Sequence, residues 1–172
     1  MPVTRPQTKL GKQLPGLDHD KPGYDRYDDS VKSDDLHPNT VQIAEISITP
    51  AEMLALRATP KTLVAAPGAG YVNELISAVA LYDYAAAFTE TADDLVIRYT
   101  NNSGAIASTT LDATGFLTAT SDQIRTHKRI ATDITPVANA ALVLHNSGDG
   151  EYGGTGSPVR YKVAYRVIKT DF

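Results

Sequence analysis

The sequence predicts an all-β protein, an antiparallel β-sandwich of the jelly-roll type, with one short helix and an extended N-terminal arm. Two observations predict this fold. From residue 41 onward, apolar and polar residues alternate in short runs between turn signals, which is typical of sandwiches and jelly rolls. The first forty residues have no apolar period and are rich in proline and aspartate. We therefore expect an arm over residues 1–40 and a β-sandwich domain over residues 41–172.

Composition excludes several classes of site and partner. The length of 172 residues suits one domain with an appendage, and the lack of cysteine excludes disulfides and thiolate metal sites. The formal net charge is −4, from 16 basic and 20 acidic residues, so we expect no nucleic-acid partner. No apolar run approaches the roughly 20 residues that span a bilayer. The N-terminus also lacks the apolar segment of a secretory signal, so we expect no membrane partner.

The β domain opens with a short β-branched run, residues 41–48, which we predict to be the first strand. Thr49, Pro50 and Glu52 then match a capping box, with threonine at the N-cap, proline at N1 and glutamate at N3. This pattern predicts a short helix over residues 50–57, whose partly buried residues are Met53, Leu54 and Leu56.

The next segment, residues 71–84, is long enough for a helix, but its β-branched and aromatic residues favour a long or bent strand. Turn signals and apolar runs divide the rest of the middle of the chain. They predict a strand that ends in a turn over residues 63–70 and further strands at 95–100, 105–109, 116–120 and 140–145. They also predict a turn at 101–104 and one helical turn at 122–128.

The last strand, residues 159–169, has the clearest alternation in the chain. One face carries Val159, Tyr161, Val163, Tyr165 and Val167, and the other carries Arg160, Lys162 and Arg166. This is the pattern of a half-buried antiparallel strand with a basic outer face. The basic face is either simply solvated or an electrostatic docking site for an acidic partner. The glycine-rich loop before it, residues 146–157, is interpreted as the flexible tip of a final hairpin.

No catalytic, metal or cofactor site is predicted, and we expect no enzyme. Two of the four histidines, His127 and His145, lie in the β domain without metal-ligand spacing, and the others are in the arm. Gly68 and Gly70 lack the rest of a phosphate-loop motif and indicate a tight turn. Residues 149–151 do not match a calcium loop, and neither a nucleophile elbow nor a cysteine is present.

The arm is too poor in apolar residues to offset its own ordering entropy. It is therefore either a disordered tail or a segment that orders on a partner. The second interpretation is favoured because apolar side chains are spread along its length. These candidate partner-binding residues are Leu10, Leu14, Leu17, Tyr24, Tyr27, Val31 and Leu36.

Two segments resemble a group of small virion proteins of tailed bacteriophages, the capsid cement or decoration proteins. The first is ITPAEMLALRATPKTLVAAPGAGYVNELISAVAL, residues 48–81, in which a short capped helix precedes an "LVxAPGAG" pattern. The second is ALVLHNSGDGEYGGTGSPVRYKVAYRVI, residues 141–168, in which a "GEYGG" loop leads into the closing strand. The arm and the middle of the chain are not covered.

The resemblance implies a jelly-roll-like domain that binds and stabilises the phage head. It implies two partners, the major capsid protein and the chain itself as a homotrimer, and a location on the capsid surface after assembly in the host cytoplasm. No catalytic residue and no cofactor come with it. For the subunit interface we expect exposed aromatic residues near the long strand, namely Tyr71, Tyr82, Tyr84 and Phe88.

Two other functions stay open. One is a phage tail, head-fibre or host-attachment module, in which the glycine-rich loop would contact carbohydrate. The other is a carbohydrate-binding β domain or a small β-fold enzyme outside the virion.

Overall fold

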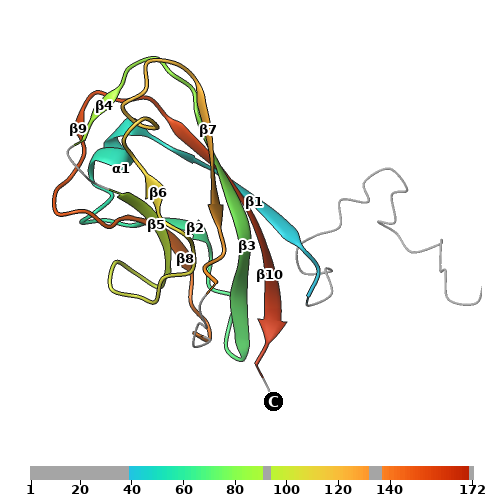
Figure 1. Cartoon of the computed structure of the whole chain (residues 1–172). Helices are drawn as coiled ribbons and strands as arrows, with labels where there is room; N and C mark the ends of the chain where they lie inside the picture. The colour runs from blue at the N-terminus through green and yellow to red at the C-terminus, as the bar shows by residue number, and fades with distance from the viewer. Residues whose placement is uncertain (1–38, 91–93, 132–136, 171–172) are drawn as a thin grey trace, which may run out of the picture. The chain divides into compact units, whose positions relative to one another are not determined.

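The computed structural model describes residues 39–90, 94–131 and 137–170. They form one short helix and ten strands, which are drawn in Figure 1. The elements are β1 Gln42–Ile48, α1 Pro50–Leu54, β2 Lys61–Val64, β3 Tyr71–Tyr82, β4 Phe88–Thr89, β5 Asp94–Tyr99, β6 Leu111–Asp112, β7 Gln123–Lys128, β8 Leu142–Asn146, β9 Gly153–Gly154 and β10 Val159–Lys169. Residues 1–38 of the predicted arm, which include its seven candidate partner-binding residues, lie outside the described residues.

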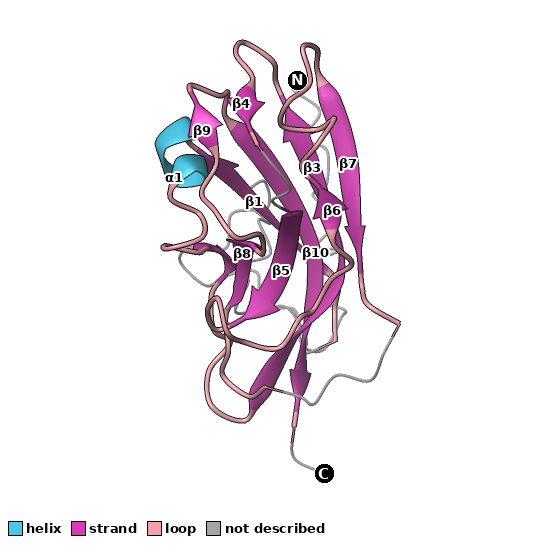
Figure 2. Ribbon diagram, turned by 60° about the vertical axis from the view of Figure 1, so that its left-hand side comes forward, coloured by secondary structure: helices cyan, strands magenta, loops and turns pink. Residues whose placement is uncertain are grey.

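The strands form two four-stranded antiparallel sheets, with orders β1-β10-β3-β7 and β2-β8-β5-β6, and β4 pairs with β9 (Figure 2). Apart from the short β4 and β9, the first strand pairs with the last, β1 with β10. Moving inward along the sequence from both ends, β2 pairs with β8, β3 pairs with β7 and β5 pairs with β6. This nested pairing is the jelly-roll topology, so the predicted fold class is confirmed. We call the two sheets the β1 sheet and the β2 sheet.

The core lies between the sheets. Its largest fully buried side chains include Tyr82, Tyr161, Phe88 and Phe116. The ring of Tyr82 lies 5.8 Å from that of Phe116 and 6.3 Å from that of Phe88, measured between centroids. In β10, burial alternates as predicted from Val159 to Val163. From Ala164 to Ile168 the strand is half-buried, and the register with β3 shifts between Ala164 and Tyr165.

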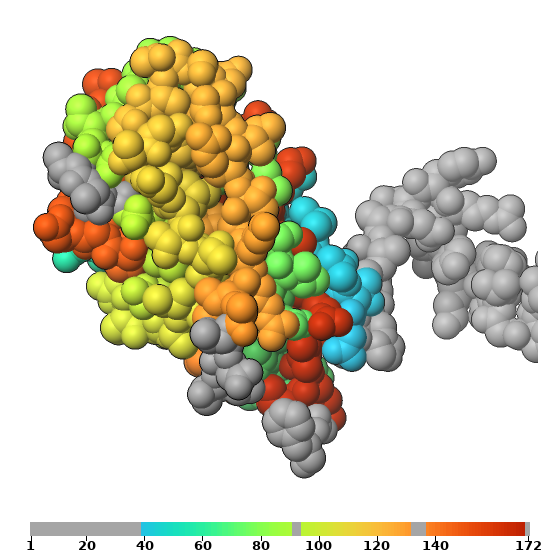
Figure 3. Space-filling model, in the orientation of Figure 1, coloured from blue at the N-terminus to red at the C-terminus, as the bar shows by residue number. Residues whose placement is uncertain are grey.

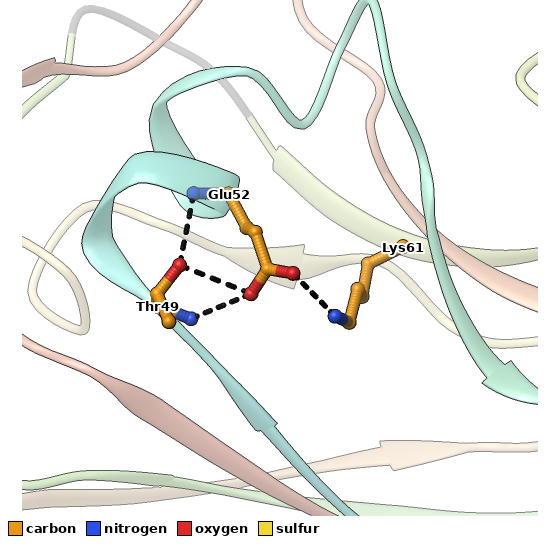
Figure 4. A network of polar contacts seen from close by, with 3 residues as sticks. All are labelled: Thr49, Glu52 and Lys61. Atoms are coloured by element: carbon orange, nitrogen blue, oxygen red, sulfur yellow. Dashed lines mark hydrogen bonds and ion pairs between the residues drawn. The ribbon is translucent and has the colours of Figure 1, made fainter.

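The helix begins with the predicted capping box (Figure 4). Thr49 N donates to Glu52 Oε2 at 2.9 Å, and Glu52 N donates to Thr49 Oγ1 at 3.3 Å. Lys61 Nζ donates to Glu52 Oε1 at 2.5 Å. Hydrogen bonds from Lys61 and from Thr49 lower the pKa of Glu52 to about 2. The helix is thereby joined to the start of β2.

The helix is shorter than predicted, since it ends at Leu54 rather than near residue 57. Glu151, from the glycine-rich loop, accepts hydrogen bonds from Arg57 N at 2.9 Å and from Ala58 N at 2.8 Å. These backbone groups are satisfied by a distant carboxylate instead of by further helical turns. Leu54 is half-buried, as expected, whereas Met53 and Leu56 are fully buried.

Two elements in the middle of the chain were predicted wrongly. Residues 116–120 contain no strand, since 116–118 lie in a turn, and the adjacent Phe116 and Leu117 are both fully buried. A strand would point successive side chains to opposite faces. Residues 122–128 contain strand β7 rather than a helical turn, because β3 offers its edge for pairing from Ser77 to Tyr82.

The predicted strand at 105–109 pairs with β5 only irregularly. Tyr99 N donates to the carbonyl oxygen of Ala105, and Ala107 N donates to that of Ile97. At the next position the side chain of Ser108 replaces the backbone as acceptor, since Ile97 N donates to Ser108 Oγ at 2.9 Å. The regular pairing of β5 is made instead with β6 and β8.

The glycine-rich loop is not a hairpin tip, because the strands it joins, β8 and β10, lie in different sheets. It packs on the domain instead: β9 within it pairs with β4, and Tyr152 is buried. Gly156 has φ +57° and lies against the ring of Phe88, where a Cβ atom would come within 2.1 Å of ring carbons. The glycines are needed here for close packing and for a left-handed backbone.

Candidate interaction surface

The outer face of the β1 sheet is the candidate functional surface. Its four strands lie side by side, with β7 in orange, β3 in green, β10 in red and β1 in blue in Figure 3. The strand register defines three rows of outward side chains across it. The rows are Ile43–Ala164–Ser77–Lys128, Glu45–Lys162–Val79–Thr126 and Ser47–Arg160–Leu81–Ile124.

Isoleucines stand at both edges of this face. Ile43 on β1 is 59 % exposed, and Ile124 on β7 is 63 % exposed. Ile43 lies opposite Ala164, and Ile124 lies opposite the half-buried Leu81. β1 and β7 are the edge strands of the sheet, so no further strand of the described chain covers these side chains. Exposed apolar side chains on sheet edges are a common basis of protein–protein contact.

The charges on this face are largely paired. Lys162 Nζ lies 2.8 Å from Glu45 Oε1, across the β1–β10 pair. Arg166 Nε lies 2.5 Å from Glu74 Oε2, and Arg129 reaches the other oxygen of Glu74 at 2.6 Å. Hydrogen bonding to Glu74 raises the pKa of the Arg166 guanidinium.

The predicted docking residues Arg160, Lys162 and Arg166 therefore differ from one another. Arg160 and Lys162 point outward and are exposed, whereas Arg166 is half-buried in its pair with Glu74. Arg160 makes no ion pair with any residue that the structure describes. It is the basic group of β10 best placed to meet an acidic partner, and docking by all three residues remains a prediction.

The aromatic residues expected at a subunit interface were mostly misassigned. Tyr82 and Phe88 are core residues, and Tyr71 is half-buried. Tyr84 is 37 % exposed. The β-sandwich needs large side chains to fill the space between its sheets, and alternation places Tyr82 on the inner face of β3. The exposed Ile43 and Ile124 were missed, because they lie in segments of mixed polarity whose outer faces become clear only from the register.

The two histidines of the β domain are separated. His127 is buried in the core, and His145 lies on the outer side of β8 in the other sheet. Within the described residues, no group of three histidine, aspartate or glutamate side chains could hold a metal ion. Gly68 and Gly70 have φ values of +101° and +79°, as the predicted tight turn requires. No helix of the described chain combines the length and apolar character needed to cross a membrane.

Comparison with known proteins adds no relative: no protein-family model matches the chain, and no curated protein matches it significantly.

Proposed function

We propose that this chain is a structural virion protein, a capsid cement or decoration protein that binds and stabilises the head of a tailed bacteriophage. One observation carries the proposal. The two segments that resemble this group, residues 48–81 and 141–168, meet in the fold: β2 pairs with β8, and β3 pairs with β10. Glu151 of the second segment also accepts hydrogen bonds from Arg57 and Ala58 of the first. The resemblance therefore falls on one connected structural unit.

Self-association is proposed to use the two edges of the β1 sheet. A cyclic trimer needs two different patches on each subunit, because each copy contacts one neighbour on either side. The patch around Ile43 and the patch around Ile124 stand on opposite edges of the same sheet. Contact between the Ile43 edge of one copy and the Ile124 edge of the next would repeat around a ring and bury both isoleucines.

The arm is proposed to bind the major capsid protein. A protein that binds the assembled shell and not its free subunits stabilises the shell by mass action. Three arms on one trimer raise the overall affinity without strong single contacts, because the second and third arms bind at a high effective concentration. The protein's role would then be mechanical, with no chemical step.

The test uses heads purified from a phage from which the gene has been deleted. The full chain should co-sediment with these heads and raise the temperature at which they release DNA. A variant that begins at Asn39 should keep its own thermal transition but lose binding, because it lacks the arm while retaining every described strand. Failure of the full chain to bind, or full binding by the shortened variant, would contradict the proposal.

A further inference from the structure

A polar pocket lies at the outer face of the β2 sheet, the sheet opposite the proposed trimer surface. Its volume is about 710 Å³. Three parts of the chain line it: the turn after α1, the turn that follows β5, and the end of β8 with the first half of the glycine-rich loop. The lining residues are Arg57 and Ala58, Asn102 and Ser103, and His145 with residues 147–151. The volume is within the range of small-molecule sites in proteins, about 300–1,000 Å³.

His145 is the buried polar group of this pocket. It is only 7 % exposed, and its Nδ1 atom has no hydrogen-bond partner among the described residues. Arg98, on the neighbouring strand β5, lies diagonally across from it, since Arg98 pairs with Val143 and His145 pairs with Val96. Arg98 Nη1 donates to the carbonyl oxygen of Gly104 at 2.9 Å, but its buried Nε also lacks a partner within the described chain. Unsatisfied buried polar atoms mark places where a ligand or ordered water completes the bonding.

Two guanidinium groups lie near His145, that of Arg57 in the pocket lining and that of Arg98 on β5. Burial lowers the pKa of His145, and the nearby guanidinium groups of Arg98 and Arg57 lower it further. Glu151 acts in the opposite direction and raises the pKa of His145, while its two oxygens accept the backbone N–H groups of Arg57 and Ala58. Asp149 is the other acid of the lining and is exposed at the rim.

The lining also contains two hydroxyl groups, those of Ser103 and Ser147. Ser103 Oγ donates to Asn101 Oδ1 at 2.9 Å, and Ser147 Oγ donates to the carbonyl oxygen of Asp94 at 3.1 Å. A hydroxyl has a single proton, so the lone pairs of both serines remain available to accept from a ligand. A fitting ligand therefore brings an anionic group for Arg57 and O–H donors for the serines.

We propose that this pocket binds a sugar that carries an oxyanion, either a sugar acid or a sugar phosphate. The Arg57 guanidinium pairs with the carboxylate or phosphate. Asn102, Ser103 and Ser147 bind the sugar hydroxyls. This site is on the opposite sheet from the proposed trimer contacts, and it does not depend on the capsid role.

Isothermal titration of the full chain with D-glucuronate, D-glucose 6-phosphate and D-glucose tests the proposal. At least one of the two anionic sugars should bind, and the one that binds more tightly identifies the preferred anionic group. Neutral glucose should bind at least about tenfold more weakly, which corresponds to a difference of ~1.4 kcal/mol in binding free energy. If neither anionic sugar binds at millimolar concentration, or if glucose binds equally well, the proposal is wrong.

Arg57→Gln is the variant that locates the site. It should weaken binding about tenfold or more, and its thermal unfolding should be unchanged, because the bonds to Glu151 use only the backbone N–H of Arg57. Lys162→Gln is the matched control, since it removes one exposed positive charge from the opposite sheet. It should leave binding unchanged. Equal weakening by both variants would show a general charge effect and overturn the assignment of the site.

Discussion

The phenolic O–H of Tyr161 donates a hydrogen bond to Nε2 of His127, 3.2 Å away in the core. The other ring nitrogen, Nδ1, lies 3.1 Å from the carbonyl oxygen of Thr109. A carbonyl oxygen can only accept, so Nδ1 carries the proton and Nε2 receives one from the tyrosine. Both side chains are fully buried. The neutral imidazole thus links β10 and β7, which stand on either side of β3.

Tyr161→Phe should destabilise the domain, because it leaves Nε2 of His127 buried without a donor. The expected loss is about 1–3 kcal/mol in the free energy of unfolding. Chemical denaturation measures it. Tyr165→Phe is the matched control: this hydroxyl donates to Gln42 Oε1 at 2.9 Å in a half-buried position, where water can replace the partner. If Tyr165→Phe lowers the free energy of unfolding as much as Tyr161→Phe does, the buried hydrogen bond to His127 contributes no more than an accessible one.

Stability should fall as the pH is lowered from 7 toward 4. Burial lowers the pKa of His127 to about 4, below the ordinary value of 6.5. Between these two values the unfolded chain binds a proton that the folded chain does not, so acid favours unfolding. The contribution of His127 is fully present above pH 6.5 and is lost as the pH falls toward 4. The free energy of unfolding should fall by roughly 3 kcal/mol over this range, because each unit of pKa difference corresponds to about 1.4 kcal/mol.

The control for this pH dependence is His127→Gln, measured by denaturation at several pH values. Its stability should fall less steeply between pH 7 and pH 4 than that of the unaltered protein. The pKa of His145 is lowered as well, by burial and then by Arg98, but that residue is present in both proteins and cancels in the comparison. Identical slopes would mean that His127 is not buried as a neutral ring.

Gly156→Ala and Gly115→Ala separate backbone strain from packing. Both glycines have positive φ, +57° and +73°, so each alanine carries a similar backbone cost of about 1–2 kcal/mol. A Cβ at Gly115 meets nothing within 4 Å, whereas one at Gly156 would overlap the ring of Phe88. Gly156→Ala should therefore lower the free energy of unfolding by ~1–3 kcal/mol more than Gly115→Ala does. Equal losses in thermal unfolding would indicate that the glycine-rich loop moves freely away from Phe88.

Val163→Asp and Arg160→Glu test the two faces of β10. Val163 is fully buried, so an aspartate there would place an unpaired charge in the core and cost several kcal/mol or prevent folding. Arg160 is exposed on the outer face, and its replacement should leave the thermal transition within ~0.5 kcal/mol of the original. Comparable damage from both substitutions would show that the strand is not two-faced.

Features that depend on neighbouring residues could be predicted from the sequence. The capping box at Thr49 needs only residues within one turn, and the alternation from Val159 to Val163 needs only one strand. The fold class follows from the same local alternation. Strand β7 could not be predicted in this way, because His127 is its one fully buried residue and Ile124 faces solvent. Its conformation is imposed by pairing with β3, which a single segment does not reveal.

The candidate sites could not be predicted from the sequence, because they depend on which distant segments the fold places side by side. Ile43 and Ile124 occupy opposite edges of one face although they are far apart in the chain. Tyr82 and Phe88 looked suitable for an interface, but the sandwich uses them to fill its core. The pocket at His145 depends on three loops that the topology brings to one place, and no sequence motif marks it.

Counting the copies of this protein in purified phage particles, by mass spectrometry with isotope-labelled standard peptides, tests the central claim most directly. A cement protein occupies every equivalent junction of the shell, so the account predicts on the order of hundreds of copies per particle, in multiples of three. A handful of copies would contradict it and favour a tail, head-fibre or host-attachment module. Absence from particles would contradict it in favour of a carbohydrate-binding domain or a small enzyme.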